Sequence, residues 1–451
     1  MSYFVGSTVE EQRQMLETLG VSSVEELFDC IPAHLRTASF DLPQSRPENE
    51  VLRHIARLSS RNRTDLINFC GGGYYEHHIP PAVDALTSRG EFFTAYTPYQ
   101  AEASQGTLQA MFEFQTAVVR LTGMEVANAS LYDGGSALFE AVMMSMRITR
   151  RDRILVDTAV NPIHRKMLQT YAANTPARIV EIPHEKGRVS RRRMEELLDE
   201  HTAAVVVQNP NFFGCVDDFT DLARAAHQRG ALLVVSFYPV SLGLLKSPGE
   251  MGADIAVGEG QSLGLPLSFG GPYLGLMATR RKYIRQMPGR IVGATQDAQG
   301  RTGYVLTLQA REQHIRREKA TSNICTNEGL CALRAIIFLA LLGPGGLRNM
   351  ALTCARRAAE ARDRLSRIPG VSFPFEHPVF NEFVIELPAD ARDVCQRMFE
   401  QGILPGIPLA DFYPGMERCL LVAVTEQRTE EDLQRLAESL QTVLSKDGNN
   451  T

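Results

Sequence analysis

The stretch Gly-Glu-Gly-Gln-Ser-Leu-Gly-Leu-Pro-Leu-Ser-Phe-Gly-Gly-Pro, residues 258–272, decides how the rest of the sequence is interpreted. Apolar runs typical of strands lie on either side of it, at 254–257 and 273–278. Its glycines and prolines exclude a regular element, so the stretch is predicted to be a loop. A loop this rich in glycine lets its backbone approach a ligand or another chain closely.

Upstream of this loop, short apolar runs alternate with amphipathic segments. The runs are continuous rather than alternating, as expected when helices cover both faces of a parallel sheet. The predicted strands are 154–157, 178–182, 203–208 and 232–237, and the predicted helices are 162–173, 190–201 and 219–229. The sequence therefore predicts an α/β doubly wound domain with a mainly parallel sheet.

Ligands of such sheets bind at the carboxyl ends of the strands. This rule is expected to bring the 258–272 loop close to a set of polar side chains. The set is Asn161, His164, Gln208, Asn209 and Tyr238. Each of these residues could equally be a helix cap or a turn residue, and for Asn161, which precedes Pro162, a cap is favoured.

Gly134, Gly135 and Ser136 form a turn between a predicted strand, 127–131, and a predicted buried helix, 137–148. A glycine turn before a helix can aim backbone N–H groups and a hydroxyl at a phosphate. Such turns also occur without any ligand, so the pattern alone leaves both interpretations open. No dinucleotide fingerprint, phosphate-binding lysine loop, zinc pattern or nucleophile elbow is present in the sequence.

Two further loops carry unusual concentrations of rings and hydroxyls. Residues 92–100 read Phe-Phe-Thr-Ala-Tyr-Thr-Pro-Tyr-Gln, and residues 321–327 read Thr-Ser-Asn-Ile-Cys-Thr-Asn before an apolar helix at 330–342. Loops of this composition line a pocket or form an interface. His77 and His78 are interpreted as loop or interface residues rather than metal ligands, because no cysteine or carboxylate stands at ligand spacing.

The chain divides into three predicted parts. Residues 1–64 form a helical arm with helices at 7–20 and 22–36, which are too short to stand alone and should pack on the main body or a neighbouring subunit. Residues 65–328 form the large α/β domain. Residues 329–451 form a small C-terminal α+β domain, and 447–451 are expected to fray.

The composition limits the classes of partner and the location that are expected for the chain. A net charge of -5, with no basic stripe, gives no reason to expect nucleic acid. Eight cysteines are scattered without a C-x-x-C pair, so reduced thiols are expected. The first residues lack the basic and apolar regions of a signal peptide, so none is expected, and no run approaching the ~18 apolar residues of a membrane span is expected. The predicted location is the cytoplasm, with no membrane association.

The order of elements resembles the fold-type-I pyridoxal-phosphate enzymes, with the aspartate-aminotransferase architecture. Longer strings are similar to the P-protein of the glycine cleavage system, glycine dehydrogenase (decarboxylating), and within that family to subunit 1, the α chain of the split form. These strings are 93–100 with 104–106, 258–261, 267–272, 287–290 and 313–326. The resemblance runs nearly end to end.

Chemistry of this family requires a lysine that forms a Schiff base with pyridoxal phosphate and an acid that holds the pyridinium nitrogen. Comparison with the catalytic half of the family puts Gln261 at the lysine position. Lys246 is the only rival, and Ser247-Pro248-Gly249 beside it resembles a surface turn. The strand 232–237 leads into Tyr238-Pro239 where the acid would be expected. The cofactor is therefore not expected to be bound covalently to this chain.

The resemblance implies a heteromeric enzyme, most simply a dimer of heterodimers, in which a homologous subunit 2 carries pyridoxal phosphate. Glycine would be decarboxylated through an external aldimine, and its aminomethyl group would pass to the lipoamide of the H-protein. This chain would lend Tyr96, Tyr99 and Gln105 to the partner's catalytic site and Thr321, Ser322 and Asn323 to its cofactor phosphate, while Gly134, Gly135 and Ser136 would be a relic cradle. Two alternatives are an autonomous pyridoxal-phosphate lyase or decarboxylase that uses Lys246 and a catalytically inert scaffold subunit.

Overall fold

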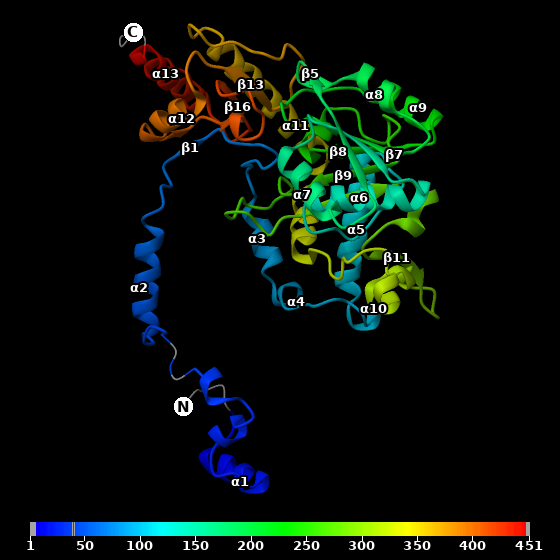
Figure 1. Cartoon of the computed structure of the whole chain (residues 1–451), viewed down its shortest axis with the longest axis vertical. Coiled ribbons are helices and arrows are strands. Elements are labelled where there is room, and N and C mark those ends of the chain that lie inside the picture. The colour runs from blue at the N-terminus through cyan, green and yellow to red at the C-terminus, as the bar shows by residue number, and fades with distance from the viewer. Residues whose placement is uncertain (1–5, 38, 40, 448–451) are drawn as a thin grey trace. The chain divides into compact units, whose positions relative to one another are not determined.

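The computed structural model describes residues 6–37, 39 and 41–447, without the side chains of 446 and 447 (Figure 1). It separates into two compact units, Met1–Thr64 and Asp65–Thr451, and the division coincides with the predicted end of the arm. The boundary predicted between 328 and 329 falls at the start of a long helix and stays a prediction. All eight cysteines are free, as expected.

The arm contains two α-helices, α1 (Val9–Leu19) and α2 (Glu48–Ser59). A capping box between Thr8 and Glu11 starts α1, and Gly20 ends it in the left-handed conformation. The helix predicted at 22–36 is wrong, because Pro32 interrupts it and only two 3₁₀ turns form, Glu25–Phe28 and Ala33–Leu35. The sequence interpretation missed α2. Neither α-helix buries a residue.

The larger unit is built on a seven-stranded sheet in the order β2-β10-β9-β8-β7-β3-β4. The five strands from β9 to β4 are parallel, and β10 runs antiparallel to both of its neighbours. The bounds are β2 Val126–Ala127, β3 Arg153–Asp157, β4 Arg178–Ile182, β7 Thr202–Asn209, β8 Leu232–Phe237, β9 Ile255–Glu259 and β10 Gly275–Thr279. The mainly parallel α/β sheet is confirmed. The predicted strand 127–131 shrinks to β2, and β9 extends two residues into the predicted loop.

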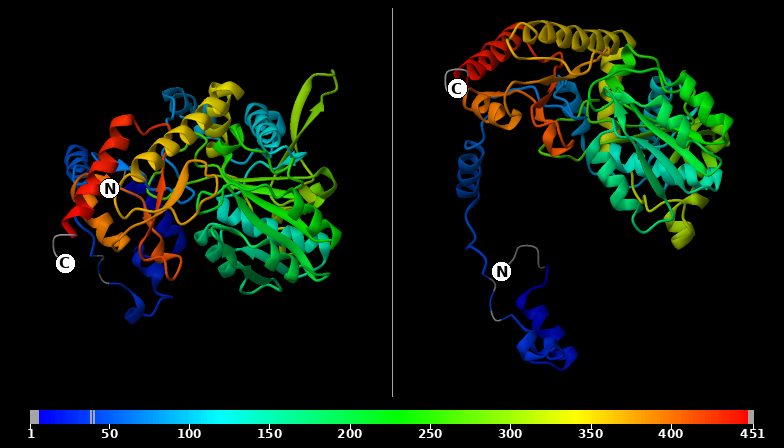
Figure 2. Two further views of the ribbon diagram at one scale, coloured as in Figure 1. Left: turned by 90° about the horizontal axis from the view of Figure 1, so that it is seen from above. Right: turned by 45° about the horizontal axis from the view of Figure 1, so that its top comes forward.

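Helices cover both faces of this sheet (Figure 2). Alternate residues of each strand enter two different cores: Leu155 and Val205 join α5 and α9, whereas Ile154 and Val206 join α6. The bounds are α5 Gln105–Thr122, α6 Gly134–Thr149, α7 Pro162–Ala172, α8 Arg191–Leu197 and α9 Thr220–Gln228. Burial on both sides explains the unbroken apolar runs of the strands.

The connection 287–320 contains a hairpin that the sequence did not predict, β11 (Ile291–Gln296) paired with β12 (Thr302–Thr307). The side chain of Gln115 on α5 anchors it, accepting from the N–H of Val292 at 2.9 Å and donating to the Val292 carbonyl at 3.0 Å. Most of the hairpin is exposed, so it lacks the apolar alternation that marks a half-buried strand.

The C-terminal part contains β13 (Glu382–Glu386), β15 (Ile407–Pro408) and β16 (Cys419–Ala423) in one antiparallel sheet. Helices α12 (Ala391–Glu400) and α13 (Glu430–Asp447) pack on it through an apolar core. Strand β1 (Ile67–Asn68) pairs with β14 (Ile403–Leu404), so residues directly after the arm bind the C-terminal part. Fraying was predicted for 447–451; Asp447 instead ends α13, and 448–451 lie outside the described residues.

Helix α11 (Gly329–Leu365) is kinked at Gly343 and passes from the large sheet to the C-terminal part. It corrects the expectation that no segment approaches a membrane span, since its most apolar 18-residue window has a mean hydropathy of 2.0. Only 33% of that window is buried inside the chain. Its buried side chains, among them Phe338 and Cys354, belong to the core of the larger unit.

Glycine is required at Gly214, where φ is +80° and an added Cβ would lie 1.8 Å from the carbonyl oxygen of Glu382. Gly300 has a similar φ of +78°, with no atom within 4 Å of such a Cβ. We expect Gly214→Ala to lower the free energy of unfolding by at least ~3 kcal/mol and Gly300→Ala by about 1 kcal/mol, because only the first adds a clash to the strain. Chemical denaturation measures both; equal losses would contradict the packing around Gly214.

Candidate functional site

The carboxyl ends of the strands converge on a small buried cavity of about 20 Å³. Asn161, His164, Gln208 and Tyr238 line it, as the sheet topology predicted, together with Glu259. Asn209 does not line it; its side chain accepts from the N–H of Asp217 at 3.1 Å. A cavity of this size has room for about one water molecule, whereas pockets for cofactors measure ~300 Å³ or more.

Gln261 lies behind the cavity lining and holds Tyr75, which lines the cavity. Its side chain is 1% exposed and pairs with both backbone groups of Tyr75, accepting from the N–H at 2.9 Å and donating to the carbonyl at 3.0 Å. The amide also donates to the carbonyl of Leu265 at 2.8 Å. The residue at the lysine position is therefore a clamp that ties the glycine loop 71–77 to the end of β9.

The side chain of Glu259 binds the N-terminus of α6. Its carboxylate accepts from the backbone N–H of Gly134 at 2.9 Å, Gln261 at 2.9 Å and Leu274 at 3.2 Å. An acidic side chain at a helix N-terminus takes the place that a bound anion would take. Burial raises the pKa of Glu259 to about 8, against the effect of these three donors.

The proposed phosphate cradle is occupied by this chain's own groups. Asp133 caps α6 by accepting from the N–H of Ser136 at 2.8 Å, and the Ser136 hydroxyl accepts from the N–H of Asp133 at 3.1 Å. A Cβ on Gly134 would lie 2.9 Å from the ring of His164. Both ring nitrogens of His164 are buried without a partner, and burial lowers its pKa to about 4, so the ring is neutral.

The glycine loop 71–77 is held from the C-terminal part as well. Glu382 on β13 accepts from the N–H of Gly72 at 2.7 Å and from the hydroxyl of Tyr75 at 2.9 Å. Asn161 donates to the carbonyl of Gly72 at 2.8 Å while it caps α7 through the N–H of Ile163, so the predicted cap is confirmed. Burial raises the pKa of Glu382 to about 7.

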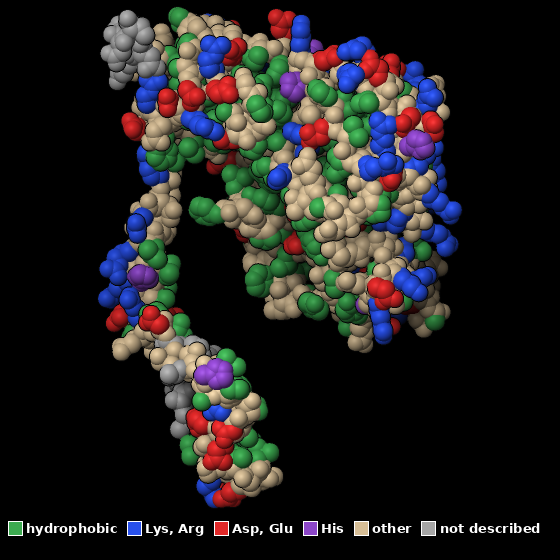
Figure 3. Space-filling model, in the orientation of Figure 1, with side chains coloured by type: hydrophobic (Ala, Val, Ile, Leu, Met, Phe, Trp, Pro, Cys, Tyr) green, Lys and Arg blue, Asp and Glu red, His purple; other side chains and the backbone are tan. Residues whose placement is uncertain are grey.

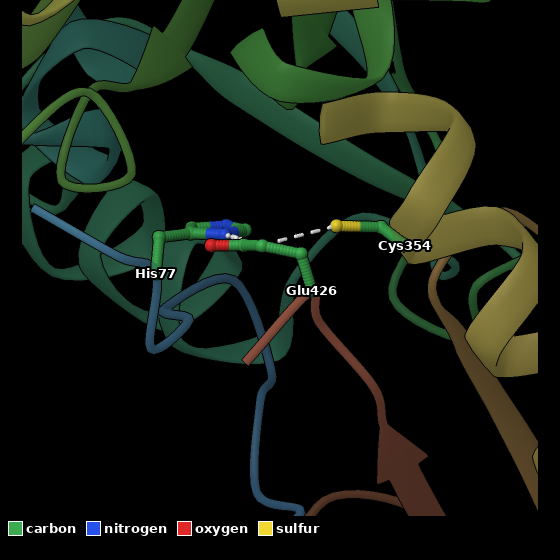
Figure 4. Close-up of side chains that lie close together, drawn as sticks. All are labelled: His77, Cys354 and Glu426. Atoms are coloured by element: carbon green, nitrogen blue, oxygen red, sulfur yellow. Dashed lines mark hydrogen bonds and ion pairs between the residues drawn. The ribbon is translucent and has the colours of Figure 1, made fainter. Parts of the chain in front are cut away.

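A further buried cluster lies beside Tyr238 (Figure 4). His77 contacts Glu426 at 2.7 Å through Nδ1 and bonds to the Tyr238 hydroxyl through Nε2, and Cys354 lies 3.4 Å from the same carboxylate. The three side chains offer ligand atoms within 4.8 Å of one another, which sequence spacing did not reveal. They already satisfy one another by hydrogen bonds, so the cluster serves as a link between loop, helix α11 and C-terminal part. The absence of a metal stays a prediction.

No described lysine side chain reaches the cavity. Lys246 is exposed and pairs with Asp218 at 3.0 Å and with the hydroxyl of Thr220 at 2.7 Å at the start of α9. The other lysines with described side chains are also exposed: Lys166, Lys186, Lys282 and Lys319. These positions weigh against a Schiff base in this chain.

The residues predicted to be lent to a partner are distributed unevenly. The side chain of Tyr96 is 81% exposed, and that of Tyr99 is 53% exposed above the guanidinium of Arg290. The amide of Gln105 is instead saturated inside the chain, bonding both backbone groups of Tyr304 at 2.8 Å. Gln105 therefore anchors β12. The hydroxyl of Tyr99 accepts from Arg290 at 3.2 Å, whereas no hydrogen bond is described for the hydroxyl of Tyr96.

The second predicted segment lies partly inside the chain. The Ser322 hydroxyl donates to buried Glu140 at 2.7 Å and accepts from the N–H of Ile324 at 3.0 Å. Asn323 is exposed, and Thr321 is half-buried. The residues that follow, 326–333, line a pocket of about 430 Å³ together with Tyr96. The structure thus brings Tyr96 to the end of this segment rather than to 321–323.

Pyridoxal phosphate does not fit this strand-end site. Gln261 stands at the predicted lysine position, Glu259 accepts from the first backbone N–H of α6, where the sequence predicted a phosphate cradle, and the remaining cavity is too small. The sequence analysis singled out Gln261 but assigned no role to Glu259, which was predicted to lie in the loop and instead ends β9. The other missed groups, Glu382 and Glu426, come from the C-terminal part and carry no local signal.

Removal of the Gln261 clamp tests its structural role. We expect Gln261→Ala to lower the free energy of unfolding by about 2–5 kcal/mol, because two buried backbone groups of Tyr75 lose their partners. Gln261→Glu should also destabilise, since it keeps the shape and loses the donor. Chemical denaturation would measure both, with exposed Gln299→Ala as a control that changes stability by less than ~0.5 kcal/mol. A Gln261→Ala variant as stable as the control would exclude the clamp.

Glu259 and Glu382 predict the pH dependence of stability. Their folded-state pKa values, about 8 and about 7, lie above the unfolded value of 4.5, so they favour folding at low pH and lose this effect as the pH rises through 7–8. We expect the free energy of unfolding to fall from ~pH 4.5, the unfolded-state pKa, up to the folded-state values of about 7 and about 8, by up to ~1.4 kcal/mol per pH unit for each group. Glu259→Gln should flatten this decline in denaturation curves, and a variant with the wild-type slope would refute the assignment.

Comparison with known proteins agrees with this architecture. The family model described as glycine cleavage system P-protein matches residues 2–440. The chain is 56% identical over 431 residues to "Probable glycine dehydrogenase (decarboxylating) subunit 1" of Oleidesulfovibrio alaskensis, covering 96% of this chain and 97% of that protein. Its identity to the protein of the same name from Geotalea daltonii is 55% over 444 residues, covering 98% and 100%.

Solved structures give the same result. A crystal structure of glycine decarboxylase (P-protein) of the glycine cleavage system, in inhibitor-bound form, has a TM-score of 0.90 and 46% identity, covering 98% of this chain and 100% of that one. A sphingosine-1-phosphate lyase of Burkholderia pseudomallei has a TM-score of 0.64 at 15% identity over 93% and 96%, which supports the fold alone. The chain belongs to the glycine cleavage system P-protein family.

Proposed function

We propose that this chain is the subunit of a two-subunit glycine dehydrogenase (decarboxylating) that does not hold the cofactor. A homologous second subunit would carry pyridoxal phosphate and its lysine, and the lipoyl H-protein would receive the aminomethyl group after glycine loses CO₂. The observation that carries the proposal is the closed strand-end site, in which Gln261 and Glu259 satisfy the groups that a cofactor would bind. The relatives' name, subunit 1, supports the existence of a second subunit.

This chain would contribute to the partner's site from its surface rather than from its own strand ends. Tyr96 and Tyr99 are exposed on one loop, and Asn323 is exposed on another. A phenol hydroxyl or an amide at the rim of a partner's site can orient a substrate carboxylate or amine by hydrogen bonds. The cytoplasm is the proposed location, in keeping with free cysteines.

The autonomous enzyme that would use Lys246 has little support. That lysine is held at the surface by Asp218 and lies outside the residues that line the strand-end cavity. The scaffold alternative differs from the proposal in only one respect: it assigns no role to the exposed tyrosines.

Cofactor labelling tests the proposal. We expect pyridoxal phosphate followed by borohydride to label the second subunit in the reconstituted complex, and to leave this chain unlabelled both alone and in the complex. Mass spectrometry of tryptic peptides locates the pyridoxyl group. A label on Lys246 that disappears in Lys246→Arg would overturn the proposal in favour of the autonomous enzyme.

The same complex separates the proposal from a scaffold. Tyr96→Phe keeps the ring and removes the hydroxyl, so a loss of about tenfold or more in glycine-dependent CO₂ exchange with unchanged assembly would assign the hydroxyl a role at the site. Tyr171→Phe, which changes an exposed tyrosine on α7, serves as the control. Wild-type exchange in Tyr96→Phe and likewise in Tyr99→Phe would favour the scaffold.

A further inference from the structure

The loop between β9 and β10 presents one phenyl ring to solvent. The side chain of Phe269 is 101% exposed, the largest exposure among the exposed apolar residues described. Its backbone has a φ of +54° and that of Ser268 a φ of +45°, a region that costs a non-glycine residue roughly 1–2 kcal/mol. An exposed aromatic ring on a strained backbone gives the isolated chain no stability, so its benefit must arise elsewhere.

This loop is nevertheless well defined. The hydroxyl of Tyr273 donates to the carbonyl of Leu267 at 2.7 Å, and the N–H of Gly270 donates to the same carbonyl at 3.0 Å. The ring of Tyr273 stacks on Tyr74 with centroids 4.8 Å apart. These contacts fix the base of the loop from which Phe269 projects.

An apolar pocket opens next to this loop. Its volume is about 430 Å³, and Pro272 lines it together with Phe92, Tyr96, Met111, Leu330 and Leu333. Glu328 is the only Asp, Glu, Lys or Arg in the lining. Figure 3 shows hydrophobic side chains over α3 (Pro81–Thr87) and α4 (Gly90–Phe93), on the same side as the loop. A surface with aromatic rings and few charges has the composition of an interface core.

Helix α11 adds a second, independent observation. Its most apolar 18-residue window is only 33% buried inside the chain, and residues 329–333 line the same pocket. Leu341, further along the helix, is 50% exposed. The start of α11 thus adds apolar side chains to the pocket lining, and Leu341 adds exposed apolar surface of the kind that another protein covers.

We propose that Phe269 inserts into the homologous second subunit and that the pocket lined by Tyr96 and Pro272 receives the corresponding loop of that subunit. Two homologous chains pair about a pseudo-twofold axis, which brings the same face of each into contact. A projecting ring and a pocket side by side on one face satisfy this symmetry, because the loop of each chain can enter the pocket of the other. This inference rests on the proposed function, which supplies the second subunit.

Binding of the full chain to the purified second subunit tests the proposal. Phe269→Ala should weaken binding at least about tenfold and Phe269→Asp at least about a hundredfold, because the ring would lie at a desolvated centre. Ala110→Trp, which fills the pocket from α5, should weaken it about tenfold or more. Leu352→Ala, an exposed apolar change on the far half of α11, should alter the dissociation constant less than about twofold.

The unfolding midpoint of the isolated Phe269→Ala chain serves as the folding control. Because Phe269 is fully exposed, this midpoint should equal that of the wild-type chain. If both Phe269 variants bound the second subunit with the affinity of the wild-type chain, the proposed insertion would be overturned and the proposed function would stand. Failure of the wild-type chain to bind the second subunit would instead overturn the proposed function. A homodimer of this chain that Phe269→Asp disrupts would assign the face to a second copy and refute the homologous partner.

Discussion

The two-way hydrogen bond between the Gln261 amide and the backbone of Tyr75 is the constraint on which the site depends. It joins the glycine loop at 71–77 to the end of β9, two segments 186 residues apart in sequence. A lysine could not make this pair, since it has donors and no acceptor. At the position where the sequence predicts a lysine in the catalytic relatives, glutamine therefore has a structural role in this chain.

Closure of such a site requires more than one residue, because a cofactor pocket is lined by polar groups that need partners when buried. Glu259 supplies acceptor oxygens at the start of α6, and Glu382 supplies acceptors for the loop. Both carboxyls have raised pKa values, so burial outweighs their hydrogen-bond donors. His164 has no partner in the remaining cavity and is neutral, as its lowered pKa requires. The chain's own groups thus replace the electrostatics of a ligand.

The sequence predicted the sheet well, because strands buried on both faces are continuous apolar runs. It did not predict β11 and β12, whose exposed faces carry no such pattern, or the second arm helix α2. The sequence singled out Gln261 but not its hydrogen-bond partner, the backbone of Tyr75. His77 and Glu426 contact each other across 349 residues, and no local pattern reveals a pair of that separation. Contacts between distant segments required the tertiary structure.

One loop links the closed interior to the open surface. Its first residues, from Glu259 to Leu265, bind inward and fill the strand-end site, and its last residues, from Leu267 to Tyr273, hold Phe269 outward beside an apolar pocket. Inward, every polar group of Gln261 is satisfied, so this end gains nothing from a ligand. Outward, the exposed ring on a strained backbone stabilises the protein only when another protein buries the ring. In a single segment, therefore, one end leaves no room for a cofactor, and the other end presents the ring that we propose a second subunit covers.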